Sequence, residues 1–448
     1  MLNFLFKLNT IVGNFLWEHF LIVAILGIGI YISLGTRFIQ IIKLPFIFKE
    51  TIIRKKRKDL EGDITPFQAL SIALAGTVGV GNIAGVATAI SLGGPGAIFW
   101  MWISGFLGMA TKFSEVVLGI KYRMRQIRGP FLGGPMVYIR RGLGRKFRFL
   151  AVIFASLGAL AAFGIGNMTQ ANSVAIGMEE FGIPKIITGI ILLLAVGLVT
   201  LGGLKRIAQV ASFCVPFMCG LYFLAGLIII LVNVEKLPQV IILILNSAFS
   251  PLAAYGGFLG AKVKEAMRWG FARGVFSNEA GLGSAPIAHA TAKTDHPVRQ
   301  GLWGIFEVFI DTIIICSVTA LVIIITGSWT SGKTGAQLTC LAFQSFWGKN
   351  LGNFLVVFSM ILTAYDTILA WGFYGETCCA YLFGHKARIF YRLLWLPFIL
   401  LGVKGTLELV WSVADTLNAL MAIPNLLAIF LLSPVVFNLT KDFFKNQK

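Results

Sequence analysis

What this chain lacks most is charge, and acidic charge above all. Asp and Glu together contribute 19 of 448 residues, Lys and Arg contribute 38, and charged residues make up 13% of the chain. A soluble domain carries about 25% charged residues, and the mean hydropathy here is +0.84. The composition therefore excludes a soluble globular protein and indicates a chain that crosses a membrane several times.

Metal-binding residues are equally scarce. The six cysteines and four histidines show no spacing typical of metal ligands. Residues 79–84 match the dinucleotide pattern G-x-G-x-x-A, but that pattern needs a preceding strand, and an apolar membrane stretch flanks it here. The net charge of +19 would suit nucleic acid only if the basic residues lined one soluble surface, whereas they cluster in short loops. We expect no enzyme, no organic cofactor and no nucleic-acid partner.

Long apolar runs are what the chain has in abundance. Runs of at least about 17 residues predict transmembrane helices, and the stretch 235–250 is short enough to lie along the membrane surface instead. The sequence predicts an all-α integral membrane protein with eleven spans, at 17–36, 65–91, 95–120, 148–178, 184–202, 207–233, 258–292, 300–327, 350–381, 388–403 and 406–438.

The loop charges predict the orientation of these spans. The loops on one side hold 27 Lys and Arg, those on the other side hold 6, and five lie within spans. Because cytoplasmic loops carry the excess of Lys and Arg, we expect the N-terminus outside and the C-terminus in the cytoplasm of a plasma (cell inner) membrane. The basic loops also predict contact with anionic lipids at the cytoplasmic face.

Two of the predicted spans contain breaks. Residues 76–82 (GTVGVGN) and 277–286 (SNEAGLGSAP) place glycines inside apolar stretches, and unwound backbone is tolerated in a membrane only where it lines protein or a cavity. A pair of interrupted spans in corresponding halves points to a transporter's binding site. We therefore expect an inverted-repeat core of five plus five helices, 65–233 and 258–438, with 17–36 as an extra N-terminal helix.

Buried polar side chains cluster at four places in these spans. The free amides at a helix break can bind a carboxylate, and the free carbonyls can bind a cation. The two breaks therefore fit a zwitterionic substrate together with a metal ion. The alternative is that the glycines only allow close helix packing. The clusters are Thr77 with Asn82; Asn167, Thr169, Gln170 and Asn172; Ser277, Asn278 and Glu279; and Thr363, Asp366 and Thr367 followed by Trp371.

The fourth cluster has the chemistry of a cation site. Thr363, Asp366 and Thr367 share one helix face, and their oxygens are hard ligands that suit sodium. A protonated or Lys-paired Asp366 is the alternative. Lys112 and Glu115 also share a face and are expected to pair, while Glu307 and Asp311 are read either as a structural contact or as transport residues.

Four segments resemble the alanine or glycine:cation symporter family. They are 76–96 (GTVGVGNIAGVATAISLGGPG), 99–122 (FWMWISGFLGMATKFSEVVLGIKY), 273–294 (RGVFSNEAGLGSAPIAHATAKT) and 371–376 (WGFYGE). The resemblance implies the leucine-transporter-like fold and sodium-coupled uptake of alanine or glycine by alternating access. Asp366 departs from the family pattern, which has a hydroxyl or neutral residue there.

The resemblance also implies two sets of site residues. Sodium ligands would fall on Ala75, Val78, Thr363, Asp366 and Thr367. Substrate contacts would fall on Thr77, Gly79, Asn82, Asn167, Gln170, Phe276, Ser277, Gly281 and Trp371. A proton-coupled carrier that uses Asp366 is the rival function; a channel or a non-transporting receptor is less favoured.

Overall fold

Helices occupy each of the ranges that the apolar runs predict. The computed structural model describes residues 9, 11–13, 15–53, 60–127, 129–179, 181–249, 263–405 and 407–446, so residues 258–262 of the seventh predicted span lie outside the described residues. The helices of the first half are η1 (Leu16–Leu21) with α2 (Ile22–Gly35), α5 (Pro66–Thr77), η3 (Gly81–Gly85), α6 (Val86–Gly93), α7 (Ala97–Tyr122), α9 (Arg148–Ala161), η5 (Ala162–Met168), α10 (Thr169–Glu179), α11 (Lys185–Thr200) and α12 (Gly203–Val232).

The second half continues in the same way. Its helices are α13 (Leu237–Phe249), α14 (Val263–Asn278), α15 (Ala285–His289), α16 (Pro297–Val308), η7 (Phe309–Cys316), α17 (Ser317–Ile325), α19 (Lys349–Phe383), α20 (Ala387–Lys404) and α21 (Leu407–Lys445). Short helices that the sequence did not predict lie in the connections, namely α3 (Ile39–Ile42), α4 (Leu44–Phe48), η2 (Lys49–Ile53), α8 (Pro135–Gly142) and α18 (Gly335–Trp347).

Length and apolarity support a smaller number of spans than eleven. Among the described residues, six helices are long and apolar enough to cross a membrane, and the bent pair α5 and α6 raises the number to seven. Helices α2 and α11 are apolar but shorter, and α20 carries three basic residues, Arg388, Arg392 and Lys404. The protein is therefore an all-α, multi-pass membrane protein, and the eleven-span count stays a prediction.

Both predicted breaks are present in the structure. Thr65 and Gln68 form a reciprocal capping box that starts α5, and the helix ends at Thr77 before resuming with a bend of 48°. In the second break Glu279 and Gly281 have positive φ angles of 54° and 93°. A non-glycine residue in this region is strained, so Glu279 is held there by its contacts.

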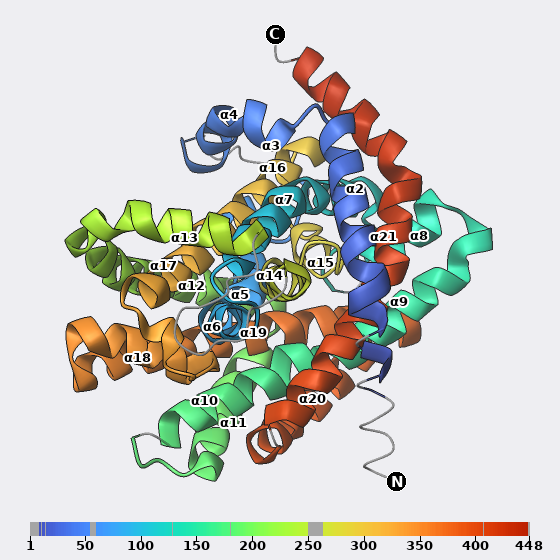
Figure 1. Ribbon diagram of the computed structural model, residues 1–448. Helices are drawn as coiled ribbons and strands as arrows, with labels where there is room; N and C mark the ends of the chain where they lie inside the picture. Colours follow the sequence, from blue (N-terminus) through green and yellow to red (C-terminus); the bar gives the residue numbers. More distant parts are fainter. Residues whose placement is uncertain are drawn as a thin grey trace.

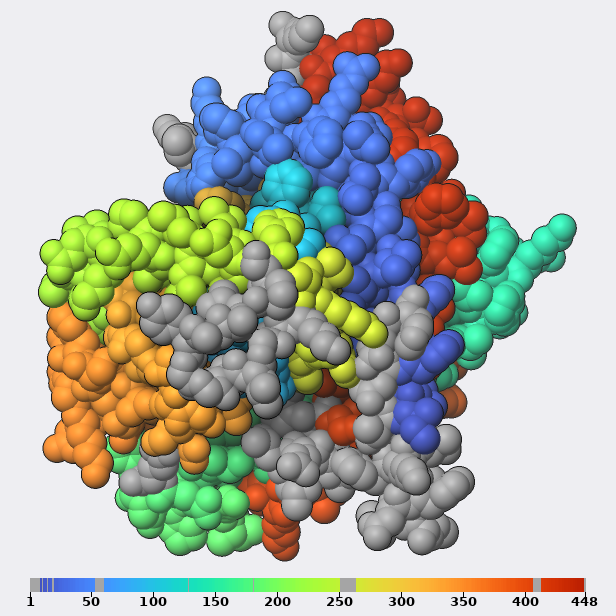
Figure 2. Space-filling view, viewed as in Figure 1, coloured from blue at the N-terminus to red at the C-terminus, as the bar shows by residue number. Residues whose placement is uncertain are grey.

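The outer surface carries the apolar side chains that a lipid environment requires. Along α11, Ile186, Ile190, Leu194 and Leu198 are exposed at helical spacing, between 41% and 70% of each residue. Large exposed side chains in water would mark an interface, but along a membrane helix they face lipid. Helices α2 and α21 lie side by side on the face seen in Figure 2, where Tyr31 packs against Phe430.

The loops rich in Lys and Arg contact one another. Arg299 pairs with Glu50, Lys43 lies 5.0 Å from the ring centre of Phe444, and Arg388 donates to Gln126. These contacts join segments 37–58, 293–299 and 441–448 with one another, and segment 121–148 with 386–392. Figure 1 places α8, which belongs to this set, and α18 on opposite sides of the bundle.

The segment beside α18 contains a misleading motif. Residues 327–334 read GSWTSGKT, which has the spacing of a phosphate loop. Its structural context is wrong, because it follows helix α17 rather than a strand. We assign it no nucleotide.

Candidate functional site

The first break is contacted by polar groups from two other helices and by one of its own side chains. Thr367 of α19 donates its hydroxyl to the Ala75 carbonyl at 2.8 Å. The Gln170 side chain of α10 accepts from the Val80 amide at 3.3 Å, and Asn82 accepts from the Gly79 amide at 2.9 Å. The amides and carbonyls that the break frees are thus partly satisfied by side chains.

Glycine is required at position 79 by this crowding. A Cβ on Gly79 would lie 2.8 Å from the Thr367 hydroxyl and 3.3 Å from the Gln170 side-chain oxygen. The separation of 2.8 Å is shorter than real Cβ atoms show. The close approach of α19 and α10 to the break therefore depends on the absence of a side chain.

Asp311 ties the two breaks together. Its carboxylate accepts from Asn82 at 2.7 Å, from Ser277 at 2.9 Å and from Thr312 at 2.7 Å. Asn82 belongs to the first break and Ser277 ends α14 at the second. Asp311 lies in the π-helical turn η7, a feature that often occurs at functional sites.

Asp366 has the opposite environment. It is 0% exposed, and within the described part of the chain neither of its carboxylate oxygens has a hydrogen-bond partner. Its electrostatic neighbours include Cys214 and Cys219 of α12. An unpaired charge in such a place is costly, so a cation or a proton is needed at Asp366.

A carboxylate of the protein occupies the amides of the second break. Glu115 of α7 accepts from the Gly281 amide at 3.1 Å and the Gly283 amide at 3.0 Å. Asn425 of α21 donates to the same Glu115 oxygen at 2.6 Å and to the Gly281 carbonyl at 2.8 Å. The anion-binding capacity of this unwound segment is therefore used within the fold.

Glu279 connects the second break to Trp371 of α19. It accepts from the Trp371 indole at 2.7 Å and from the Ser284 hydroxyl, which explains how its strained backbone is maintained. A Cβ on Gly166 would lie 2.0 Å from the Cβ of Trp371, so α19 packs directly on the η5 backbone. Trp371 is fixed from two sides.

Phe276 closes the same region from α14. A Cβ on Gly81 would lie 3.1 Å from its ring. The Arg273 guanidinium lies 5.5 Å from the ring centre and pairs with Asp415 of α21 at 3.0 Å. The first break thus contacts Phe276, and an ion pair lies beside that ring.

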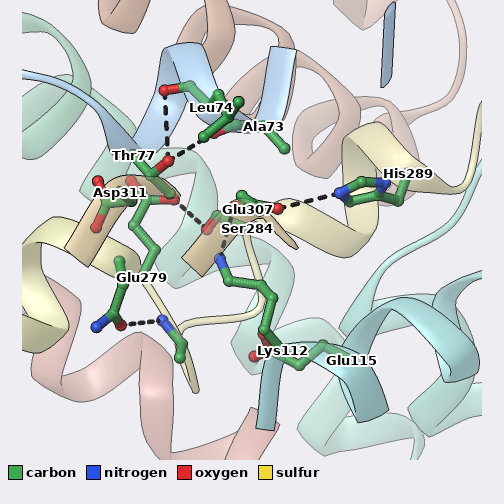
Figure 3. Close-up of polar contacts among 12 residues, drawn as sticks. Ala73, Leu74, Thr77, Lys112, Glu115, Glu279, Ser284, His289, Glu307 and Asp311 are labelled. Atoms are coloured by element: carbon green, nitrogen blue, oxygen red, sulfur yellow. Dashed lines mark hydrogen bonds and ion pairs between the residues drawn. The ribbon is translucent and has the colours of Figure 1, made fainter. Parts of the chain in front are cut away.

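A buried chain of charges links α7, α16 and α15, and it corrects the expected Lys112–Glu115 pairing. Lys112 pairs with Glu307 at 3.1 Å, and Glu307 contacts His289 at 3.1 Å on its other side. Figure 3 shows Glu307 between these two partners. Glu115 binds the second break instead of Lys112, because the free amides of Gly281 and Gly283 compete for its carboxylate.

The structure brings many of the sequence-predicted residues together, but three of them are engaged elsewhere. Ala75, Val78, Gly79 and Asn82 lie at the first break, which Gln170 and Thr367 contact. Phe276 packs on Gly81, Ser277 shares Asp311 with Asn82, and Trp371 reaches Glu279 of the second break. The Thr363 hydroxyl donates to the Met360 carbonyl of its own helix, and the Asp366 carboxylate has no partner within the described residues. The Thr77 hydroxyl bonds to Ala73 and Leu74 of its own helix. Asn167 donates to the Trp395 carbonyl on α20 at 2.9 Å, and Gly281 is engaged by Glu115 and Asn425.

Sequence reasoning named three charged residues of the site but assigned none of them a sodium or substrate contact. Asp311, Glu115 and Glu279 each contact a break. Their presence inside apolar spans was the available signal, because ionisable residues within membrane helices are costly and usually functional. Their partners lie up to hundreds of residues away, which sequence spacing does not show.

Comparisons with known proteins agree with this architecture. Residues 2–448 match the sodium:alanine symporter family. The chain is 46% identical over 454 residues to the sodium/alanine symporter AgcS of Methanococcus maripaludis, covering 100% of this chain and 99% of that protein. It is 40% identical over 470 residues to the putative sodium/proton-dependent alanine carrier protein YrbD of Bacillus subtilis, covering 100% of this chain and 93% of the relative.

A solved structure shares the fold at low sequence identity. The manganese transporter of Eremococcus coleocola superposes with a TM-score of 0.50 at 14% identity, covering 82% of this chain and 78% of that one. This likeness concerns the fold alone. Together with the family match, the breaks and the buried carboxylates, it leads to one conclusion: the chain belongs to the sodium:alanine symporter family and is a cation-coupled amino-acid symporter, not an enzyme.

Proposed function

We propose that this protein imports a small neutral amino acid, alanine or glycine, together with sodium. The observation that carries the proposal is the Asp366 carboxylate, buried without a hydrogen-bond partner and adjacent in sequence to Thr367, which contacts the first break. A charged Asp at mid-membrane costs roughly 2.5–3.5 kcal/mol on insertion scales. A sodium ion bound there offsets this cost.

The donor set suits sodium. Carboxylate, hydroxyl and carbonyl oxygens are hard ligands, and they are supplied by Ala75, Val78, Thr363, Asp366 and Thr367. The Thr367 hydroxyl lies 2.8 Å from the Ala75 carbonyl, so two of the five proposed ligands are already in contact. Sodium is a co-substrate in this proposal, and it binds where α19 meets the first break.

The amino acid binds beside the sodium site, between the two breaks. The proposed contacts there are Gly79, Asn82, Gln170, Phe276, Ser277 and Trp371. Thr77, Asn167 and Gly281 would contact the substrate only after release from their present partners. A small substrate is favoured by the tight packing around this region, since a Cβ would lie 3.1 Å from the Phe276 ring at Gly81 and 2.0 Å from the Trp371 Cβ at Gly166. The names of both relatives, a sodium/alanine symporter and an alanine carrier protein, include alanine.

The proposed architecture is an eleven-span protein with its N-terminus outside and C-terminus in the cytoplasm. Helix α2 is the extra N-terminal span, and residues 65–233 and 258–438 form the two inverted repeats. The contacts between basic loops support a common side for segments 37–58, 293–299 and 441–448, and a common side for 121–148 and 386–392. Anionic lipid headgroups would lie against the cytoplasmic face.

Sodium influx supplies enough free energy for uptake. One monovalent cation that crosses 100 mV gains about 2.3 kcal/mol, and a tenfold gradient adds roughly 1.4 kcal/mol. Together these support accumulation on the order of 500-fold. Sodium and amino acid would jointly stabilise the occluded arrangement, so that neither crosses productively alone.

A proton-coupled carrier is the second candidate, and the same carboxylate favours it. A protonated Asp366 would also be neutral in its buried position. The YrbD relative is named as a putative sodium/proton-dependent carrier, which includes both ions. The two candidates predict different driving gradients.

The test is uptake of labelled alanine and glycine into proteoliposomes under separately imposed sodium and proton gradients. Wild type is compared with Asp366→Asn and with the control Glu179→Gln, which removes a surface carboxylate that pairs with Lys185. We expect sodium-driven accumulation in wild type and in the control, and its loss in Asp366→Asn. Accumulation driven by a proton gradient alone would show that the protein is the proton-coupled carrier. If neither amino acid is taken up, alanine and glycine are not its substrates.

A further inference from the structure

The segments that adjoin the two broken helices are paired with each other at one end of the site. Residues 60–64 precede α5, and residues 290–293 follow α15. Ile64 and Ala292 form a parallel bridge. The Asp63 amide donates to the Thr291 carbonyl at 2.8 Å, and the Lys293 amide donates to the Ile64 carbonyl at 2.8 Å.

Arg123 clasps both segments at once. One terminal nitrogen of its guanidinium donates to the Ala290 carbonyl at 3.0 Å and to the Ala292 carbonyl at 2.6 Å, and the other donates to the Glu61 carbonyl at 2.8 Å. The planar fork of arginine can bind acceptors on two chains in this way, and a lysine ammonium cannot reproduce its geometry. No other side chain described here is hydrogen-bonded to both segments.

The clasp itself is held in place. The Arg123 guanidinium lies 4.5 Å from the ring centre of Phe131, and the Phe131 amide donates to the Asp63 carboxylate at 2.6 Å. Arg141 of α8 donates to the Tyr122 and Arg123 carbonyls at 3.2 and 3.1 Å. Arg123 is thus oriented by an aromatic ring and by a neighbouring arginine.

The two segments that Arg123 holds together lead directly to the two breaks. Helix α5 leads directly to Ala75 and the first break, while α15 leads back to the second break. Helix α14, the half of the second broken helix on the other side of the break, is held in a different way, by the Arg273–Asp415 ion pair. Any movement that separates the near halves of the two broken helices must first break the contacts of Arg123.

We propose that Arg123 is a positioning residue of the cytoplasmic gate, which keeps the inner halves of both broken helices together and must release them before substrate leaves to the cell interior. This inference rests on the proposed function for its direction, because the cytoplasmic side is assigned from loop charge. Release of the Arg123 contacts opens the inner exit, and their formation closes it during the outward-facing part of the cycle.

The reactivity of a reporter cysteine tests the gate. Thr291→Cys places a thiol in the paired segment, where residue 291 is 0% exposed. The full-length protein is placed in lipid nanodiscs without sodium or amino acid, labelled with a hydrophilic maleimide and quantified peptide by peptide. Native Cys378, buried in α19, reports general loosening of the fold.

Three further substitutions are compared in this reporter background. We expect Arg123→Gln to raise the labelling rate of Cys introduced at 291 about tenfold without changing Cys378. Arg123→Lys keeps the charge but loses the planar guanidinium, and Arg141→Gln removes only the hydrogen bonds to the Tyr122 and Arg123 carbonyls. We expect both variants to raise the labelling rate less than Arg123→Gln does. They keep the test possible if Arg123→Gln fails to fold. Arg125→Gln, an exposed arginine in the same loop, is the matched control and leaves the rate unchanged.

Transport gives an independent readout of the same gate. When only a tenth of the molecules remains outward-facing, the apparent KM for external alanine rises about tenfold. The proposed role of Arg123 would be wrong if Arg123→Gln left the labelling rate of the cysteine at position 291 unchanged, or raised that of Cys378 equally. Because labelling needs neither sodium nor alanine, a failure of coupled uptake would refute the proposed function and leave the gate intact.

Discussion

Two aspartates buried at the same site have opposite surroundings. Asp311 and Asp366 are both 0% exposed. Asp311 accepts hydrogen bonds from the side chains of Asn82, Ser277 and Thr312, whereas neither Asp366 oxygen has a partner in the described residues. A satisfied carboxylate can serve to hold helices together, but an unsatisfied one requires something that binds to it. The difference separates a scaffold residue from a ligand-binding residue.

The largest expected effect comes from removing the unsatisfied charge. Asp366→Asn keeps the shape but loses the negative charge that the sodium ion would neutralise. We expect sodium affinity to fall about 100-fold, or ~2.7 kcal/mol, while stability without sodium does not fall. The apparent sodium affinity of alanine uptake measures the change. Equal sodium affinity in the variant would remove Asp366 from the cation site.

The satisfied aspartate is expected to respond in the reverse manner. Asp311→Ala leaves the donors of Asn82, Ser277 and Thr312 without their acceptor, which should lower the free energy of unfolding by about 2 kcal/mol. Unfolding in detergent measures this effect, with Asp415→Ala at the more exposed ion pair as the control. If Asp311→Ala leaves stability unchanged and abolishes sodium binding, the contrast between the two aspartates is wrong.

Glu115 extends the comparison to a second satisfied carboxylate. Glu115→Gln retains an oxygen that can accept from Gly281 and Gly283, but these bonds lose their charge assistance. We expect a loss of about 1 kcal/mol in stability and a larger loss for Glu115→Ala. Thermal unfolding of both variants tests the order. A glutamine variant that is less stable than the alanine variant would contradict the proposed role of this oxygen.

The sequence predicted the breaks better than their partners. The segment 76–82 carries its own signal, because three glycines in an apolar run favour an unwound helix. Asn167 was placed beside Gln170 by helical spacing, but the π-helical turn η5 alters the register. Asn167 consequently donates to Trp395 on α20. Spacing rules fail where the helix type changes.

The carboxylate partners show the second limit of sequence reasoning. Lys112 and Glu115 share a helix face, yet each binds a group from a distant segment, Glu307 and the second break respectively. The sequence contains no information on which helices lie opposite α7. Local spacing therefore identified charged positions correctly and assigned their partners incorrectly.

The smallest expected effect is the contribution of His296 to the pH dependence of stability. This contribution must be known before a pH dependence of uptake is assigned to Asp366. Burial lowers the pKa of His296, Asp295 and Asp442 raise it, and Lys121 lowers it further. Neutral His296 accepts from the Val298 amide and caps α16. Because the folded-state pKa lies below the unfolded value of about 6.5, this stability is present above that pH and declines as pH falls through it.

The histidine contribution can be removed by substitution. His296→Asn supplies a side-chain cap that does not titrate. We expect a small loss of stability between neutral and mildly acidic pH in wild type and a reduced loss in the variant, measured by thermal unfolding. Identical pH profiles would show that His296 contributes nothing, and any remaining pH dependence of uptake could then be examined at Asp366.

Equilibrium binding of radioactive sodium to the purified protein tests the central claim most directly. Wild type, Asp366→Asn and Asp311→Asn are compared at constant pH, with and without alanine. We predict that Asp366→Asn loses sodium binding about 100-fold while Asp311→Asn retains it within a few-fold. Sodium binding that persists in Asp366→Asn at the wild-type affinity would contradict the assignment of the unsatisfied carboxylate as the cation site.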